Sequence, residues 1–419
     1  MARFRRFTAL CGALAIVVSA CSTASTPEST TATSSTSTTL QAAAVASTST
    51  TTPATTTTEQ PIDPVSVTGD LDAAIAAVLS NALTALNDPR AESDLPEVMG
   101  EHHATDVGTF ASTYGAVATI AELADGTQVG VVRLDSDDVV LIADEGDGWQ
   151  VVGTHMTSLD AAPFYGESPR RVLVLGSDAR PGQNPPVFRM DSIHVLTAVP
   201  SENTGAILGY PRDSWVDTEY GSMRVNALTS SGRGPDALYS FFTNEWETPV
   251  EGYILTGFSG FERLVDATLG RLEIRIPIPI PTQEWFDGFS AGEQRLSGLR
   301  TLDFARTRKL IPGGDFTRSF HQGIVMLAVL TMLQRGEVET VPMLLAELSK
   351  YTETNLSASD LIQLGAAAMD MDIGTITNEV LPGSLGRTSG GASVVFLDGG
   401  WQTIVQDVVD DGIRNESSG

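Results

Sequence analysis

Residues 172–180 are Val172-Leu-Val-Leu-Gly-Ser-Asp-Ala-Arg180, an apolar run that ends in an Asp and an Arg. A short apolar run without polar alternation is typical of a β-strand that is buried on both faces. In open α/β sheets, ligands bind beyond the carboxyl ends of the strands. We therefore expect Asp178 and Arg180 to face a ligand from the end of a central strand.

Strand-like and helix-like segments alternate on the carboxyl side of this run. Two further apolar runs, 193–199 and 205–208, are expected to be strands of the same sheet. Apolar strands interleaved with helices predict an α/β fold, with a central, mostly non-edge sheet that helices cover on both faces. We assign this domain to residues 166–415. Its helices are expected to begin near Pro235, Gly260, Leu299, Ser319, Val341, Ser359 and Trp401.

A smaller segment precedes this domain. Residues 71–86 carry apolar side chains at helical spacing, and three short apolar runs between 129 and 152 are separated by Asp-rich turns. This pattern predicts a helix and an antiparallel meander in a small α+β module at residues 61–165. The pair His102-His103 has no carboxylate or Cys at ligand spacing, which favours a solvated loop over a metal site. The pattern indicates no function for the module.

The amino terminus is typical of an exported protein. An Arg-rich start is followed by an apolar run at 7–18, which is too short to span a bilayer comfortably and has the length of a signal-peptide core. The sequence Val18-Ser-Ala-Cys21 follows, and small residues before a Cys are the pattern of a bacterial lipoprotein cleavage site. We expect residues 1–21 to be a lipoprotein signal peptide and Cys21 to carry the lipid. The alternative is an ordinary secretory signal with an incidental Cys.

A Ser/Thr-rich tract follows the expected anchor. Residues 22–60 contain 24 Ser or Thr among 39 positions. Such a tract cannot bury enough apolar surface to fold, so we expect a disordered, solvated stalk. A stalk would let a folded domain extend away from the membrane.

The charge balance excludes one class of partner and indicates another. The formal net charge is −27, whereas binding to a nucleic-acid backbone requires a basic face. The basic residues are 23 Arg and only two Lys, and 15 of the Arg lie between Arg170 and Arg318. Because the guanidinium fork matches phosphate oxygens, this stretch favours local anion binding. The alternative is a proteome-wide preference for Arg over Lys.

Three further segments concentrate Arg and Asp near the ends of expected elements. The segment Arg189-Met-Asp191 opens the second strand, and Pro211-Arg212-Asp213 follows the third. The last segment surrounds the start of a helix, where Asp315, Arg318 and Gln322 share one face at spacings i, i+3 and i+7. It also contains Arg306 and Arg308.

This set of residues suits a pyrophosphate. Arg forks neutralise the oxygens and the charge that develops on phosphorus during transfer. Two Asp residues beside such a site would repel the anion unless they hold a divalent cation such as Mg²⁺. No single element is specific, because an Asp-x-x-Arg pair is usually a surface ion pair.

The segments together, in this order, resemble the LytR–CpsA–Psr family of cell-envelope phosphotransferases. Members carry an apolar strand that leads into Gly-Ser-Asp-x-Arg, then Arg-x-Asp, Pro-Arg-Asp, an Asn after a basic residue, and an Ala-Arg-x-Arg helix before Asp-x-x-Arg-x-x-Arg-Gln. Here the Asn element is Arg224-Val-Asn226, and residues 257–270 resemble the family's strand-to-helix segment. The resemblance runs from about residue 170 to 413.

The resemblance implies an enzyme at the outer face of the cell membrane, anchored as a lipoprotein. It would move a polyprenyl-pyrophosphate-linked glycopolymer onto a peptidoglycan hydroxyl in cell-wall assembly, assisted by Mg²⁺. Asp178 and Asp191 would be the metal ligands, Asp315 and Gln322 would shape the site, and Asp213 is a less certain member. The pyrophosphate would be held by six Arg residues: Arg180, Arg189, Arg212, Arg306, Arg308 and Arg318.

Two features of the helix expected from Ser319 qualify this assignment. His321 stands where the family usually has Arg, which replaces a permanent charge by one that titrates near neutrality. The alternative is a substitution on the helix surface without consequence. The family binds the polyprenyl tail in an apolar tunnel, and several side chains of this helix could line one, although most are expected to be plain core. These are Ile324, Met326, Leu327, Val329, Leu330 and Met332.

Three other functions are weighed against transfer. A transcriptional attenuator, an older label for the family, would need a DNA-facing domain, which the signal peptide, stalk and charge oppose. A non-catalytic lipid- or glycan-binding protein is opposed by the retained Arg and Asp. A pyrophosphatase would use water at the same site, and the sequence does not distinguish it from a transferase. The general base, the glycopolymer and the acceptor hydroxyl are also left open.

Overall fold

A mixed six-stranded sheet forms the centre of the larger half of the protein. The computed structural model describes residues 62–411, with gaps at 89, 93–94, 104–109, 181, 231, 245 and 247. The expected signal peptide, Cys21 and the stalk lie outside the described residues. The strand order is β14-β11-β6-β7-β8-β15. In that order the strands are Thr352–Thr354, Gly252–Gly257, Arg170–Ser177, Met190–Val199, Thr204–Gly209 and Thr377–Val380.

The three inner strands β6, β7 and β8 are antiparallel neighbours. Strands β11 and β15 flank them in parallel with β6 and β8, and β14 closes one edge. All three apolar runs expected to be strands lie in this inner group. The α/β prediction of a central sheet is therefore confirmed, because β6, β7 and β8 have neighbours on both sides.

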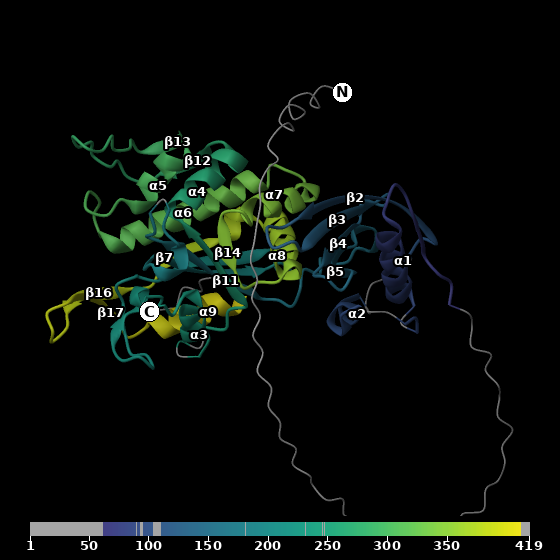
Figure 1. Ribbon diagram of the computed structural model, residues 1–419, viewed down its shortest axis with the longest axis horizontal. Helices are drawn as coiled ribbons and strands as arrows, with labels where there is room; N and C mark the ends of the chain where they lie inside the picture. The colour runs from purple at the N-terminus through teal and green to yellow at the C-terminus, as the bar shows by residue number, and fades with distance from the viewer. Residues whose placement is uncertain are drawn as a thin grey trace, which may run out of the picture. The chain divides into compact units, whose positions relative to one another are not determined.

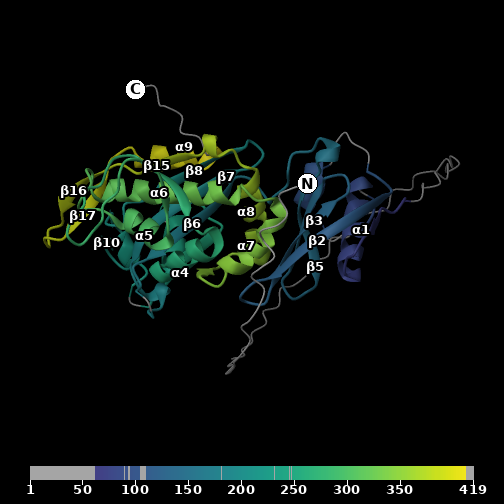
Figure 2. The ribbon, with the colours of Figure 1, turned by 90° about the horizontal axis from the view of Figure 1, so that it is seen from above.

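Helices cover both faces of the sheet (Figure 1). One face packs its apolar side chains, including Leu173, Val195 and Leu208, against α3 (Pro235–Asn244) and α9 (Trp401–Asp411). The opposite face is covered by α4 (Phe258–Leu264), α5 (Gly298–Arg306) and α6 (Asp315–Leu333). Figure 2 shows α6 lying across the strands.

Local sequence fixes where α5 and α6 begin. Ser297 caps α5, its hydroxyl accepting a hydrogen bond from the Arg300 backbone N–H. Gly313 and Gly314 precede α6 with φ angles of 76° and 57°, a left-handed conformation that favours Gly. This turn brings Asp315 to the first position of α6.

Helix α6 has the length and apolar composition of a membrane-spanning helix, the one such helix among the described residues. It packs on β7, β8 and β15, and its first turns bury Arg318 and Gln322. These contacts identify α6 as a core helix of the domain.

The leading module is a five-stranded sheet whose strands follow chain order. Helices α1 (Ala73–Asn87) and α2 (Glu97–His103) pack on one face. The predicted helix and antiparallel meander are confirmed, whereas the long second strand was not predicted. The strands β1 to β5 are Ser66–Thr68, Thr113–Glu122, Gln128–Leu134, Val139–Asp144 and Trp149–His155.

The second face of this sheet is covered by helices from the carboxyl-terminal half. Val131 and Leu141 share an apolar core with Val341 of α7 (Val341–Leu348) and Ile362 of α8 (Ala358–Asp370). The module therefore packs against the larger half through a common core. The boundary at residues 165 and 166 stays a prediction.

The solvated loop expected at His102-His103 is wrong. Both residues belong to α2, and His103 is buried with its Nε2 2.7 Å from Thr154 Oγ1. Helix α2 has only seven residues, which is too short for its apolar spacing to distinguish a helix from a loop in the sequence.

Candidate active site

The two predicted metal ligands lie at the same end of neighbouring strands. Asp178 follows β6 and Asp191 is the second residue of β7, which runs antiparallel to β6. The Asp178 backbone N–H donates to the Arg189 carbonyl at 3.0 Å, so the two segments are joined at this end. The Asp178 Oδ1 atom is buried and has no hydrogen-bond partner among the described residues. Burial, and then the charge of Asp191, raise the pKa of the Asp178 carboxyl.

Arg212 bridges the carboxylates from the end of β8. Its Nη1 contacts Asp191 Oδ1, and its Nε lies 3.8 Å from Asp315 Oδ1 and 3.8 Å from Asp213 Oδ2. Burial acts to lower the pKa of Arg212, but these three carboxylates outweigh it and the pKa is raised. Asp191 is therefore held in an ion pair with Arg212.

Asp315 is the meeting point of three Arg residues. Its Oδ1 lies 2.9 Å from Arg318 Nη2 and 3.7 Å from Arg308 Nη1, in addition to Arg212. Arg318 is only 5% exposed, and burial lowers its pKa despite the opposing charge of Asp315. The Nε atoms of Arg212 and Arg318 are buried without a hydrogen-bond acceptor in the described part of the chain. Buried donors of this kind favour an anionic ligand that supplies oxygens.

Arg306 and Gln322 connect α5 with its neighbours. The Arg306 guanidinium carbon lies 4.1 Å from the centre of the Phe258 ring, a cation–π contact that holds the side chain beside α4. The Gln322 side-chain amide donates to the Ala305 carbonyl at 3.3 Å, which ties α6 to α5. Phe258 was not singled out from the sequence, because one Phe in an apolar segment has no distinguishing signal.

An apolar cavity of about 250 Å³ opens beside these charged groups, between the sheet and helices α4, α5 and α6. Its polar lining residues include Asp191, Arg306, Arg318 and Gln322, which come from the first turns of α6, the start of β7 and the end of α5. Residues farther along β7 and α6, and residues of β6 and α4, are apolar. They include Val174, Leu196, Phe261, Met326, Val329 and Leu330.

Five of the six candidate tunnel residues lie at the cavity or in an apolar core. Met326, Val329 and Leu330 line the cavity, and Val329 also packs with Ile324 and Met332 against an apolar core beneath the hairpin of β12 (Leu272–Ile276) and β13 (Gly292–Leu296). The expectation that most are plain core is therefore wrong for half of the set.

A second cavity of about 410 Å³ continues from the same charged groups. It shares Asp191, Arg306 and Arg318 with the apolar cavity, and it adds Arg308 and Trp285. The charged groups therefore stand where an apolar space meets a more open, polar one.

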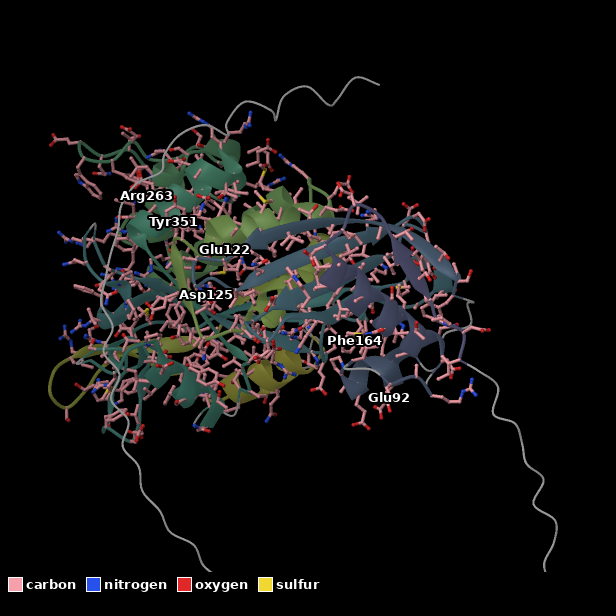
Figure 3. The ribbon with its side chains drawn as sticks, turned by 45° about the vertical axis from the view of Figure 1, so that its right-hand side comes forward. Glu92, Glu122, Asp125, Phe164, Arg263 and Tyr351 are labelled. Carbon is pink, nitrogen blue, oxygen red and sulfur yellow. The ribbon has the colours of Figure 1, made fainter. Side chains whose placement is uncertain are left out.

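The structure brings together most, but not all, of the predicted site residues. Arg189 is exposed and acts on Asp178 through its charge and its backbone carbonyl. Arg180 is also exposed and lines another cavity, of about 300 Å³, so the structure does not place it among the clustered residues. Arg263 and Tyr351, which are labelled in Figure 3, line the same cavity as Arg180. Arg180 opens a turn after β6, in which the Gln183 N–H donates to the Arg180 carbonyl at 2.9 Å. The residues gathered in the cluster are Asp178, Asp191, Arg212, Asp213, Arg306, Arg308, Asp315, Arg318 and Gln322.

Both expectations for His321 are wrong. The side chain is 1% exposed and stacks on Phe304 with ring centres 4.3 Å apart, so it is neither a surface residue nor a neutral-pH titrating group. Burial lowers the pKa of His321 to about 4. At neutral pH it is an uncharged core residue on the side of α6 that faces α5.

The buried His residues give a testable dependence of stability on pH. Burial also lowers the pKa of His194 to about 4, whereas the ordinary value is 6.5. The unfolded chain then binds protons that the folded chain does not, so stability is lost as the pH falls from about 6.5 to 4. His321→Phe keeps the stacking on Phe304 but has no group that titrates here. Between pH 6.5 and 4, its unfolding free energy should fall by up to about 3 kcal/mol less than that of the wild type. Denaturant unfolding at pH 7 and pH 4.5 measures this, and equal losses in both proteins would refute it.

Comparison with known proteins identifies the family. A model of the LytR_cpsA_psr family matches residues 153–406, from β5 to α9. The chain belongs to the LytR–CpsA–Psr family. The match covers the six-stranded sheet, the charged cluster and the apolar cavity, whereas residues 62–152 of the leading module lie outside it.

Relatives and solved structures agree with this assignment. The chain is 27% identical over 210 residues to the polyisoprenyl-teichoic acid–peptidoglycan teichoic acid transferase TagV of Bacillus subtilis (strain 168), covering 47% of this chain and 52% of TagV. It is 29% identical over 205 residues to the transferase TagU of Bacillus cereus, covering 47% of this chain and 63% of TagU. The chain thus spans between half and two thirds of these relatives.

Two crystal structures share the fold. That of Bacillus subtilis TagV has a TM-score of 0.50 at 23% identity, covering 60% of this chain and 100% of that chain. That of gbs0355 from Streptococcus agalactiae has a TM-score of 0.51 at 20% identity, covering 60% and 90%. At this level of identity the likeness concerns the fold alone.

Proposed function

We propose that this protein is an extracytoplasmic phosphotransferase that moves a polyprenyl-pyrophosphate-linked glycopolymer onto peptidoglycan during cell-wall assembly. The observation that carries the proposal is the junction of the apolar cavity with Arg306 and Arg318. A prenyl chain needs an apolar space, and a pyrophosphate needs several guanidinium donors. The names of TagV and TagU, which are teichoic acid transferases, support the same class of reaction.

The chemistry assigned to the cluster is charge neutralisation and positioning. The acceptor hydroxyl attacks the phosphorus that bears the glycan and loses its proton to solvent, a new P–O bond forms, and the bond to the leaving polyprenyl phosphate breaks. Negative charge grows on the leaving phosphate, where Arg306, Arg308 and Arg318 supply preorganised donors. Asp315 holds Arg318 and Arg308 in place by the ion pairs described above.

A divalent ion fits the residues present. Asp178 offers a buried carboxylate oxygen without a hydrogen-bond partner among the described residues, and its raised pKa means that Arg189 and Arg212 do not fully compensate the burial of this charge beside Asp191. Asp178 and Asp191 would hold Mg²⁺, which commonly takes one or two carboxylates together with substrate phosphates. When bound, the ion would neutralise charge on the phosphates. No group of three or more metal-ligating side chains occurs in the described residues, so the substrate would complete the coordination.

A transfer assay tests the proposal. Purified protein would be incubated with Mg²⁺, peptidoglycan and a prenyl-pyrophosphate-linked glycan labelled in the sugar. We expect the label to become covalently attached to peptidoglycan through a phosphate. Release of a soluble glycan phosphate, with or without peptidoglycan, would instead identify a pyrophosphatase, and no turnover of either kind would reject both.

Filling the apolar cavity should weaken binding of the prenyl chain. Met326→Trp on α6 adds bulk to the cavity wall, and each methylene kept out of an apolar site costs about 0.8 kcal/mol. Displacing two methylenes corresponds to about tenfold weaker binding of a long-chain prenyl pyrophosphate. In calorimetric titrations, Met326→Trp should keep the wild-type affinity for inorganic pyrophosphate. The control variant Met343→Trp, at an exposed position of α7, should keep the wild-type affinity for the long-chain prenyl pyrophosphate. Unchanged long-chain affinity in Met326→Trp would place the chain elsewhere.

We also propose that Cys21 is lipidated and anchors the protein to the outer face of the cell membrane. The support is the Val18-Ser-Ala-Cys21 pattern after a short apolar run. Cys21→Ala should move the protein from the membrane fraction to the soluble fraction of fractionated cells. Retention of a cleaved Cys21→Ala protein in the membrane would count against the anchor. Cys11, the other Cys of the sequence, lies inside the expected signal peptide, and Cys11→Ala serves as the control.

A further inference from the structure

An aromatic side chain projects into solvent beside the charged cluster. Trp285 is 74% exposed, more than any other aromatic residue that the structure describes. Exposure of so large an apolar side chain to water is unfavourable, and Trp is enriched among the residues that contribute most to binding at interfaces. Its ring centre lies 5.7 Å from that of Phe286, with the two planes inclined by 39°.

The loop that carries Trp285 is held in shape. Between β12 and β13, the backbones of Ile280 and Phe289 exchange hydrogen bonds of 2.8 and 2.9 Å, and Gln283 pairs in the same way with Phe286. Gly288 adopts a φ of 58°, and a Cβ there would lie 2.4 Å from the Ile280 carbonyl oxygen. Trp285 therefore stands at the tip of a narrow, ordered turn.

Contacts from Arg300 of helix α5 hold this turn in place. The Arg300 guanidinium carbon lies 4.1 Å from the centre of the Phe289 ring, and its Nη2 donates to the Gly288 carbonyl. Asp303 contacts the same guanidinium at 3.4 Å. Because α5 also ends in Arg306, one helix sets the position of both the aromatic turn and the charged cluster. A surface fixed in this way loses little conformational entropy when it binds a ligand.

Trp285 and Phe286 form one wall of the 410 Å³ cavity that continues from the cluster. Asp303, Thr307 and Arg308 supply polar groups around it, and the volume lies in the range of small-molecule sites. An aromatic wall with hydrogen-bonding groups at its edge suits a pyranose ring, which has an apolar face of C–H groups and a rim of hydroxyls.

We propose that Trp285 and Phe286 stack against the sugar that is joined directly to the pyrophosphate of the donor. This inference rests on the proposed function. Its basis is continuity: the two cavities share Asp191, Arg306 and Arg318, so a pyrophosphate at these residues has the prenyl chain on one side and the sugar on the other. Trp285 would then determine how strongly the sugar contributes to donor binding.

The test compares two ligands that differ only in the sugar. One is a prenyl pyrophosphate, and the other is the same prenyl pyrophosphate carrying one N-acetylhexosamine. Calorimetric titration of the wild type should show the sugar-bearing ligand binding about tenfold more tightly, a factor equal to about 1.4 kcal/mol. Trp285→Ala should bind both ligands equally while keeping the wild-type affinity for the sugarless one. Trp285→Phe, which retains a ring, should preserve most of the difference.

A control and the contrary outcomes complete the design. Leu385→Ala removes another strongly exposed apolar side chain, on the β16–β17 hairpin (Gly383–Arg387 and Ser393–Leu397), and should leave both affinities unchanged. If Trp285→Ala keeps the full difference in affinity between the two ligands, or if the wild type binds both ligands equally, then Trp285 does not stack against the sugar. In either case the proposed function stands. If the wild type binds neither ligand, the proposed function itself fails.

Discussion

Arg306→Ala and Arg308→Ala should each slow glycopolymer transfer by one to two orders of magnitude. Each removes one charge-assisted contact to phosphate, which contributes about 1.5–3 kcal/mol, and a factor of ten in rate corresponds to about 1.4 kcal/mol. Arg306 is exposed and Arg308 half-buried, and neither belongs to the apolar core, so the melting temperature should change little. The measurement is the initial rate of labelled glycan transfer, together with thermal unfolding of each variant.

A matched control separates this effect from loss of surface charge. Arg295 lies on β13, is largely exposed and contacts Glu273 at 3.6 Å, outside both cavities. Arg295→Ala should retain wild-type rates. Equal rates for Arg306→Ala, Arg308→Ala and Arg295→Ala would remove the Arg cluster from the mechanism.

Asp178→Asn should raise the Mg²⁺ concentration needed for transfer by about tenfold or more. Losing even a group that only orients a metal ligand typically costs 10–100-fold in affinity, and the carboxylate itself should matter at least as much. Chelator should abolish activity in the wild type, and added Mg²⁺ should restore it. The Mg²⁺ titration of the initial rate measures the shift.

Stability provides a second measurement that does not depend on turnover. Because burial and Asp191 raise the pKa of Asp178, the ionised carboxylate destabilises the metal-free fold, and this cost grows as the pH rises through that pKa. Asp178→Asn should therefore unfold at an equal or higher temperature than the wild type in chelator, while gaining less from added Mg²⁺. Asp70→Asn, an exposed control, should match the wild type in both respects. Full activity in chelator would reject the metal ligand assignment.

The fold was largely predictable because its signals are local. Apolar runs without alternation predicted β6, β7 and β8, and apolar spacing placed the starts of the later helices within a few residues. Strand β2 was not predicted, because its burial alternates irregularly and its sequence is rich in Thr, Ala and Gly. The packing of α7 and α8 on the leading sheet depends on contacts between residues about 200 positions apart, which no local pattern encodes.

The site was predictable in composition but not in arrangement. Charge and chain position placed Asp178, Asp191 and Arg212 at strand ends, and helical spacing placed Asp315 and Arg318 together. The direction in which an exposed side chain points after a turn cannot be obtained from spacing, which is why Arg180 was predicted to join the pyrophosphate clamp although it lines another cavity.

Burial explains the other error. His321 comes one residue before Gln322, but each step turns a helix by about 100°, so the His321 ring faces α5 and the core. The exposure of Trp285 could not be predicted, because the sequence of a Pro-rich loop does not distinguish an exposed Trp from a buried one.

The most direct test of the central claim is a crystal structure of the protein soaked with Mg²⁺ and a prenyl pyrophosphate. We expect the prenyl chain to fill the cavity beside Met326 and Leu330, and the pyrophosphate oxygens to contact Arg306 and Arg318. A pyrophosphate bound away from these Arg residues, or a chain bound outside the cavity, would contradict the account.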